Sequence, residues 1–216
     1  MSPKSAFIVF EGIDGSGTST QAERLASRLR EKGRAVHLTR EPSDGPIGVL
    51  IRQALRRRLV VPTADGGRSP RMETMALLFA ADRMDHLECE IEPRLERGEI
   101  VLCDRYLYSS LAYQSATGED GEASIPWLLE LNRYARTPDL VLLFDVPPAE
   151  AGRRRALRGS DEEIFEVDAL QERIARAYSA LPERLRDIPF ERIDASATLE
   201  AVEVAILAAL EARGIR

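Results

Sequence analysis

The chain has 216 residues, of which 44% are hydrophobic and 31% are charged, and its formal net charge is −6. This composition is ordinary for a globular protein, and the length suits one large α/β domain spanning residues 1–216. The acidic balance argues against general nucleic-acid binding, and no apolar run approaches the roughly 18 residues of a membrane span.

The N-terminal segment and the cysteines exclude two further classes of protein. The first ten residues, MSPKSAFIVF, lack the hydrophobic core of a secretory signal, so we expect a cytoplasmic location. Cys89 and Cys103 are too few and too isolated for a disulfide framework or a metal site. Almost all cationic side chains are arginines, since only Lys4 and Lys32 are lysines.

Short apolar runs alternate with helical patterns along the chain. The apolar runs predict strands over residues 6–11, 35–39, 100–104, 140–144 and 190–193. Periodic apolar positions predict helices over 19–33, 47–55, 70–87, 88–97, 106–113, 125–135, 149–158, 168–185 and 198–213. Polar connections rich in chain breakers are expected at 40–46, 63–69 and 117–124. The alternation favours a parallel five-stranded sheet flanked by helices on both faces, a three-layer α/β/α fold.

Polar side chains mark the ends of the predicted strands. Glu11, Arg40, Asp104 and Asp145 each lie at or next to the carboxyl end of a strand. Because ligands of parallel α/β sheets bind at that edge, we expect the polar chemistry to gather there.

The stretch FIVFEGIDGSGTSTQ, residues 7–21, has the layout of a phosphate-binding loop: strand, glycine-rich turn and helix N-terminus. Its spacing Gly12-x4-Gly17-x-Ser19 fits the pattern G-x4-G-K-[ST] except at Thr18, where the lysine belongs. The loop amides and the helix start form an anion site, and Ser19 is placed to ligate Mg²⁺.

Thr18 leaves the loop without the cation that normally lies along the β- and γ-phosphates. Lys4 and Lys32 lie about 20 Å away, at the far ends of the first strand and the first helix, so any replacement charge must be an arginine. Asp14 places a carboxylate beside the expected phosphates. It suits a hydroxyl or a metal, or it is a turn aspartate that bonds its own backbone.

Four further stretches, TREP (39–42), LFAADR (78–83), DRYLYSSLAYQ (104–114) and the arginine-rich segment ending in Phe165-Glu166, agree on one family. Together with FEGIDGSG they resemble thymidylate kinase, a P-loop nucleoside monophosphate kinase, over nearly the whole chain. The resemblance implies a P-loop NTPase fold and transfer of the ATP γ-phosphoryl group to dTMP, with Mg²⁺, to give dTDP. It also implies a homodimer, for which apolar helices near residues 72–87 could serve as the interface.

The resemblance also implies roles for individual residues. Phe79 would stack on thymine, Arg83 would bond its O4, and Ser110 would lie near N3. Tyr113 would pack under the deoxyribose beside Gln114, and Asp14 would accept from the 3′-hydroxyl. Arg105 would bind the dTMP phosphate together with Arg52, and Asp104 would hold the Mg²⁺ shell through water.

The implied acceptor site is Asp14, Glu41, Pro42, Arg52, Phe79, Arg83, Arg105, Ser110, Tyr113 and Gln114. The implied ATP site is Gly12, Ile13, Asp14, Gly15, Ser16, Gly17, Thr18, Ser19 and Thr20. Plainer alternatives are core packing for Phe79 and Tyr113 and a structural salt bridge for Arg105.

The segment RRRALRG, residues 153–159, resembles the family's lid, which would cover about residues 150–166. Arg154 and Arg158 share a helix face at i and i+4, as do Arg155 and Arg158 at i and i+3. With Asp14 and Arg105, Arg154 and Arg158 are our catalytic candidates, although the sequence does not choose among the lid arginines. A solvated basic helix face is the alternative, and Ile164 stands where the family usually has another arginine.

Three hypotheses follow. The first is an active dTMP kinase whose lid arginines and Mg²⁺ offset the missing lysine. The second is a catalytically impaired protein that binds dTMP and ATP as a sensor or partner subunit, because loss of the cation can cost on the order of 10³-fold in rate. The third, a deoxynucleoside kinase, is disfavoured because Arg105 and Arg52 suit a substrate that already carries a phosphate.

Overall fold

A parallel five-stranded sheet lies at the centre of the computed structural model, which describes residues 5–64, 66–158 and 168–215. The strand order is β2-β5-β1-β6-β7, and every neighbouring pair is parallel. The strands are β1 (Ala6–Gly12), β2 (Val36–Arg40), β5 (Ile100–Asp104), β6 (Leu140–Asp145) and β7 (Phe190–Asp194). The predicted three-layer fold is confirmed, with strand boundaries within one residue of the expectation.

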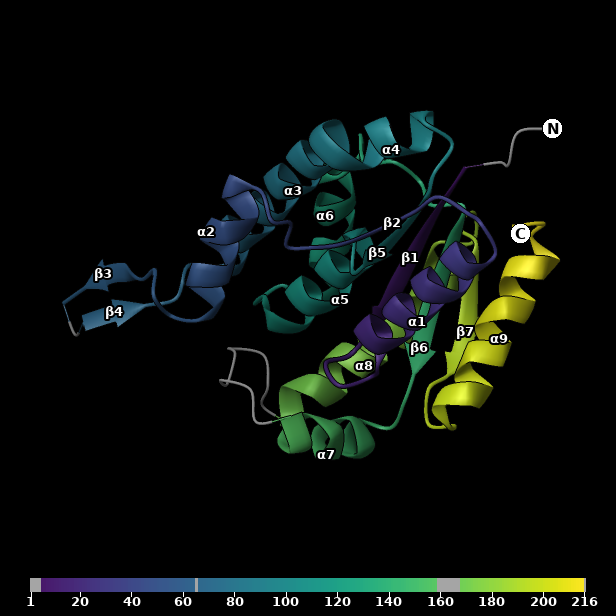
Figure 1. Cartoon of the computed structure of the whole chain (residues 1–216). Helices are drawn as coiled ribbons and strands as arrows, with labels where there is room; N and C mark the ends of the chain where they lie inside the picture. Colours follow the sequence, from purple (N-terminus) through teal and green to yellow (C-terminus); the bar gives the residue numbers. More distant parts are fainter. Residues whose placement is uncertain (1–4, 65, 159–167, 216) are drawn as a thin grey trace.

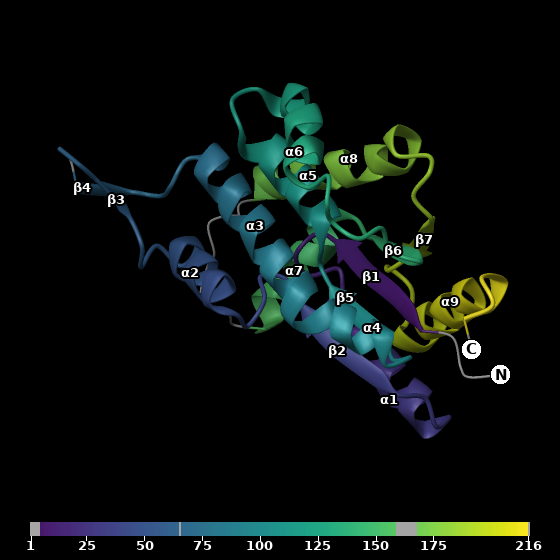
Figure 2. The ribbon, with the colours of Figure 1, turned by 90° about the horizontal axis from the view of Figure 1, so that it is seen from above.

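Helices cover both faces of this sheet (Figures 1 and 2). Helices α1 (Thr18–Glu31) and α9 (Leu199–Ala212) pack on one face. Helices α5 (Leu107–Thr117) and α8 (Asp168–Arg184) pack on the other. Phe7, Ile8, Val9 and Phe10 of the central strand are fully buried, which explains why β1 is apolar on both faces.

The other elements lie around this core. They are α2 (Pro46–Leu55), α3 (Met72–His86), a π-helical turn η1 (Leu87–Ile91), α4 (Glu92–Glu96), a 3₁₀ turn η2 (Gly121–Ser124), α6 (Ile125–Leu131) and α7 (Pro148–Arg158). The predicted helices 70–87 and 88–97 are one continuous rod, because α3 runs through η1 into α4. No helix in the described ranges is long and apolar enough to cross a bilayer.

The main difference from the sequence prediction is the segment 61–68. It was expected as a polar connection from residue 63 onward, but it forms an antiparallel hairpin of β3 (Val61–Thr63) and β4 (Gly66–Arg68). The hairpin projects away from the sheet between α2 and α3 (Figure 2). Gly66 has φ +120°, a backbone conformation that glycine adopts without steric cost at a tight turn.

The sheet register aligns the strand ends that carry polar residues. Asp104 lies beside Phe10 on one side and Arg40 on the other, and Gly12 lies beside Phe144. The carboxyl ends of β1, β2, β5 and β6 therefore form one edge, as expected for a ligand site in a parallel sheet.

Candidate active site

The loop between β1 and α1 turns tightly at two glycines. Gly15 and Gly17 have φ of 88° and 94°, in the left-handed region that glycine tolerates, and Gly17 is the N-cap residue of α1. The N–H of Ser16 donates to the carbonyl of Ile13 at 3.1 Å. This strand–turn–helix geometry is the one the sequence predicts, and a helix N-terminus there is suited to bind an anion.

Ser19 and Asp104 come together at the start of α1. The Ser19 hydroxyl donates to Oδ2 of Asp104, and the buried Oδ1 of Asp104 has no hydrogen-bond partner. Hydroxyl and carboxylate oxygens are ligands that Mg²⁺ prefers, so this pair fits the predicted metal role. Among the described residues no cluster of three or more His, Cys, Asp or Glu side chains could hold a metal.

Arg105 connects the phosphate loop to the neighbouring cavity. Its backbone has φ 69°, a left-handed conformation unusual for a non-glycine residue, and its N–H donates to the carbonyl of Phe10 at 2.9 Å. The guanidinium donates to the Gly12 carbonyl (3.0 Å) and to Oδ1 of Asp14 (2.6 Å). It also lies over the ring of Tyr113, with the guanidinium carbon 5.2 Å from the ring centroid.

The Asp14 carboxylate bonds two side chains rather than its own backbone. One oxygen accepts from Arg105, and Oδ2 accepts from Nε2 of Gln171 on α8 at 3.0 Å. The turn-aspartate alternative therefore does not describe the structure. Arg105 pairs with Asp14 and not with the adjacent Asp104, so its salt bridge joins two parts of the site.

Glu11 is a fully buried carboxyl that the sequence analysis noted only as a strand-end residue. Its Oε1 accepts from the backbone N–H groups of Tyr106 and Ser109, at 2.9 and 3.1 Å. Its Oε2 accepts from the hydroxyls of Ser109 and Tyr178, at 2.6 and 2.9 Å. Burial nevertheless raises the pKa of Glu11 to about 7, against the effect of these donors. Glu11 thereby ties the end of β1 to α5 and α8 beneath Arg105.

A cavity of about 380 Å³ opens beside the loop, between α3, α5 and the carboxyl ends of the strands. This size is typical of a site for a small organic ligand. All of the predicted acceptor residues except Arg52 line it: Asp14, Glu41, Pro42, Phe79, Arg83, Arg105, Ser110, Tyr113 and Gln114. Motifs from four separate stretches of sequence are thus brought together in one cavity.

Arg52 does not line this cavity. Its guanidinium donates to the carbonyls of Pro42 (2.8 Å) and Ser43 (2.5 Å) and pairs with Asp44 at 3.3 Å. It therefore supports the turn that carries Glu41 and Pro42, and its phosphate-binding role stays a prediction. Arg40, which the acceptor prediction did not include, lines the cavity instead.

Two cavity-lining side chains carry buried polar atoms without partners. Among the described residues, both amide atoms of Gln114 and Nε of Arg83 have no hydrogen-bond partner. Such atoms are rare in folded proteins, which makes these two side chains candidates to bond the donors and acceptors of a ligand. A nucleobase has both.

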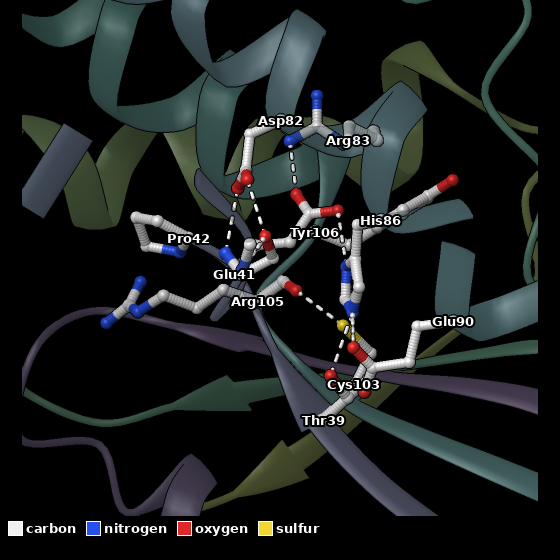
Figure 3. A network of polar contacts seen from close by, with 12 residues as sticks. Thr39, Glu41, Pro42, Asp82, Arg83, His86, Glu90, Cys103, Arg105 and Tyr106 are labelled. Carbon is white, nitrogen blue, oxygen red and sulfur yellow. Dashed lines mark hydrogen bonds and ion pairs between the residues drawn. The ribbon is translucent and has the colours of Figure 1, made fainter. Parts of the chain in front are cut away.

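A polar network includes two of the cavity-lining residues, Glu41 and Arg83 (Figure 3). Glu41 accepts from Nη2 of Arg83 at 2.7 Å and faces Nδ1 of His86 at 3.5 Å. His86 Nε2 lies 2.8 Å from the hydroxyl of Thr39. Asp82 accepts from the N–H of Ser43 at 2.8 Å. These contacts hold the β2–α2 connection against α3, so that the TREP and LFAADR stretches form one wall.

Helix α7 packs directly on the phosphate loop. A Cβ on Gly15 would lie 2.4 Å from the carbonyl oxygen of Ala151, so no larger residue fits there without a shift. Arg155 donates to the Asp14 carbonyl at 2.7 Å, and Arg154 donates to the Ala195 carbonyl at 2.9 Å.

The lid arginines at 154, 155 and 158 have different surroundings in the structure. Arg154 lines a second cavity, of about 290 Å³, together with Ser16, Gly17 and Thr20 of the loop. Arg155, which was not among the catalytic candidates, reaches the loop backbone directly. The side chain of Arg158 and residues 159–167, with Ile164, lie outside the described part of the chain. Catalytic roles for Arg154 and Arg158 therefore stay predictions.

Comparison with known proteins agrees with this geometry. The thymidylate kinase family model matches residues 10–206. A probable thymidylate kinase of Pyrococcus abyssi is 43% identical over 202 residues, which cover 94% of this chain and 94% of the relative. The thymidylate kinase of Desulfotalea psychrophila is 42% identical over 176 residues, covering 81% of this chain and 80% of the relative. The solved thymidylate kinase from Candida albicans has the same fold, with a TM-score of 0.81, 24% identity and coverage of 100% of this chain and 95% of that one. The chain therefore belongs to the thymidylate kinase family.

Proposed function

We propose that this protein transfers the γ-phosphoryl group of ATP to dTMP and yields dTDP, the precursor of dTTP. The observation that carries the proposal is the bond between Arg105 and Asp14. Asp14 belongs to the phosphate loop and also lines the acceptor cavity. A donor nucleotide on the loop amides and an acceptor in the cavity would therefore meet at this pair.

Phosphoryl transfer needs little covalent participation by protein side chains. Phosphoryl transfer needs two anions held in line and their charge neutralised. Arg105 and Arg40 supply positive charge at the cavity, and Arg155 supplies it at the loop backbone. Phe79 and Tyr113 offer apolar faces to a base and a sugar, and Gln114 and Arg83 offer polar atoms to the base edge.

Mg²⁺ would be held by Ser19 and, through water, by Asp104. The ion would supply positive charge that neutralises the phosphates during transfer. The two residues are already hydrogen-bonded to each other, so they need no rearrangement to face one ion.

The test is an assay of ADP release with dTMP, dCMP, dUMP and AMP as acceptors. We expect turnover to be fastest with dTMP and to require Mg²⁺. If no monophosphate gave turnover above background, the result would contradict the proposal. Thymidine outcompeting dTMP would point to a deoxynucleoside kinase instead.

The impaired nucleotide-binding protein remains the second candidate, and Thr18 is the observation that favours it. Thr18 is buried at the first position of α1, where a lysine would normally reach the phosphates. This alternative predicts dTMP binding by calorimetry without phosphoryl transfer. Arg155 supports the active enzyme, because it brings a cation to the phosphate loop, at the Asp14 carbonyl.

We also propose that the protein is a homodimer through α3 and α6. Leu77 and Met84 on α3 are 53% and 40% exposed, and Tyr134, just after α6, is 70% exposed. Sedimentation velocity should show a dimer that Leu77→Glu dissociates. Val204→Glu is the control, because Val204 is 66% exposed on α9, on the opposite face of the sheet. A monomeric wild-type protein would contradict the proposal.

A further inference from the structure

Arg83 lies in the cavity wall, and its guanidinium is held by three side chains. Only 1% of the residue is exposed. Nη2 donates to Glu41 at 2.7 Å and to the Ser110 hydroxyl at 3.1 Å, and Nη1 donates to Oδ1 of Asn132. Nε has no acceptor in the part of the chain that the structure describes. The bonds at the two Nη atoms therefore determine which way the remaining N–H groups face.

Asn132 comes from a part of the chain that no nucleotide motif covers. It is the C-cap residue of α6, it is 6% exposed, and it does not line the cavity. Its Nδ2 donates to the carbonyl of Leu128 at 2.8 Å. An amide has a donor side and an acceptor side, so this bond turns Oδ1 toward Arg83. The orientation of the Asn132 amide is thus fixed by the helix that carries it.

Glu41 and Asn132 make different contributions to Arg83. Figure 3 shows the ion pair between Arg83 and Glu41, which compensates the buried charge. The two Nη2 contacts, to Glu41 and to the Ser110 hydroxyl, both lie at one nitrogen and leave the guanidinium able to tilt about it. The Asn132 contact at Nη1 is a second fixed point on the other nitrogen, and the Tyr106 ring, 5.1 Å from the guanidinium carbon, covers one face.

We propose that Asn132 is a positioning residue for base selection, which acts by fixing the guanidinium of Arg83. The inference rests on the proposed function, in which Arg83 contacts the acceptor base. A guanidinium has five N–H donors and no acceptor, so in a fixed orientation it favours a pyrimidine with a carbonyl oxygen at position 4. It disfavours a pyrimidine with an amino group there, because two donors would face each other. Asn132 therefore controls the preference for dTMP over dCMP without touching either nucleotide.

The experiment measures steady-state kinetics of Asn132→Leu, which keeps the branched shape of the side chain and removes its polar atoms. We expect KM for dTMP to rise roughly tenfold, because the buried Nη1 loses its partner and Arg83 tilts. KM for ATP and kcat at saturating dTMP should stay within about twofold, and the dTMP-to-dCMP ratio of kcat/KM should fall roughly tenfold. Asn132→Asp keeps an acceptor toward Arg83 and should retain most of the wild-type selectivity.

Leu128→Ala is the matched control, since Leu128 is fully buried one turn earlier in α6. It should lower the Tm at least as much as Asn132→Leu while it leaves the dTMP-to-dCMP ratio unchanged. The inference is overturned if Asn132→Leu keeps the wild-type ratio, or if Leu128→Ala shifts the ratio equally. Should Asn132→Leu fail to fold, Asn132→Ala is measured with the same criteria.

Failure of the proposed function can be told apart from failure of this inference. If the wild-type protein shows no turnover but binds dTMP in calorimetry, the kinase proposal falls. The Kd for dTMP, compared with that for dCMP, then replaces KM, and an unchanged Kd ratio in Asn132→Leu overturns the inference.

Discussion

Thr18 is the residue at which this phosphate loop departs most from its pattern. Its side chain is neutral and buried at the start of α1, and among the described residues Arg105 and Arg155 donate to carbonyls of the loop. A guanidinium bonded to a loop carbonyl can screen the phosphates, but it does not lie along them as a loop lysine does. The loop therefore has positive charge in a different place rather than none.

Thr18→Lys should raise kcat by tenfold or more, because it adds a cation at the β- and γ-phosphates, where transition-state charge develops. The measurement is kcat at saturating ATP and dTMP. Ser27→Lys, at an exposed position further along α1, is the charge control and should leave kcat unchanged. A fall in kcat for Thr18→Lys would mean that the loop and Arg155 are built around the threonine.

Glu11 gives the protein a pH dependence with a definite sign. Burial raises its pKa from 4.5 to about 7, so the folded state binds more protons than the unfolded state between these values. Stability is therefore lost as the pH rises through this window, by up to about 3 kcal/mol. Glu11→Gln removes the titration and lets the rotatable hydroxyls of Ser109 and Tyr178 accept from the new amide.

Urea denaturation at pH 5, 6, 7 and 8 checks this prediction. The free energy of unfolding of the wild-type protein, relative to Glu11→Gln, should fall from pH 5 to pH 7 and then level off. A difference that rises over the same range would mean that the donors around Glu11 outweigh its burial.

At the scale of elements, the contact between α7 and the phosphate loop couples the predicted lid to the donor site. Gly15 has φ 88° and faces the Ala151 carbonyl, so both its backbone conformation and its lack of a Cβ are required. Arg155 reaches the loop only while α7 is packed in this way.

Gly15→Ala should therefore raise KM for ATP and lower kcat, each by about tenfold. The new Cβ would lie 2.4 Å from the Ala151 carbonyl oxygen, so the loop or α7 must move. KM for dTMP should change less, since the acceptor cavity, apart from Asp14, is formed by other elements. Gly33→Ala is the control: Gly33 also has a positive φ, 78°, but a Cβ there meets no neighbour. Equal kinetics for the two variants would show that α7 does not need to pack on the loop.

Most elements could be predicted from the sequence because their patterns are local. The five strands of the main sheet are short apolar runs, and each is found within one residue of its expected bounds. The β3–β4 hairpin was missed because its strands have three residues each and no buried face. The π-helical turn was missed because an inserted residue in a helix leaves no clear trace in apolar spacing.

The residues of the candidate site also divide into those that the sequence predicts and those that it does not. Residues of local motifs, such as Asp14 in the loop after β1 and Arg83 on α3, were expected in the acceptor site and line the cavity. Asn132, Gln171 and Tyr178 were missed, because they come from α6 and α8 and contact the site only through the tertiary fold. A buried polar residue on a helix does not reveal from sequence which distant group it bonds.

At the scale of the whole molecule, charge is distributed unevenly around the cavity. Residues 56–71 contain five arginines and one aspartate, a net charge of +4, so the rest of the chain carries −6 − 4 = −10. Leu55, Ser69 and Pro70, at the base of this segment, line the acceptor cavity. Arg56, Arg57 and Arg58 are exposed at its start. A positive segment at the mouth of a site on an acidic protein attracts anionic nucleotides toward that site.

The triple substitution of Arg56, Arg57 and Arg58 by Gln should thus raise KM for dTMP about three- to tenfold at low ionic strength, with kcat unchanged. The difference should shrink as salt is raised to about 1 M, where the screening length falls to about 3 Å. A control triple of Arg97, Arg186 and Arg213 removes the same charge near the opposite edge of the sheet and should leave KM unaltered. An equal rise in KM for dTMP in both triple variants would mean that net charge causes it. A rise that persists at high salt would mean that these arginines contact the nucleotide directly.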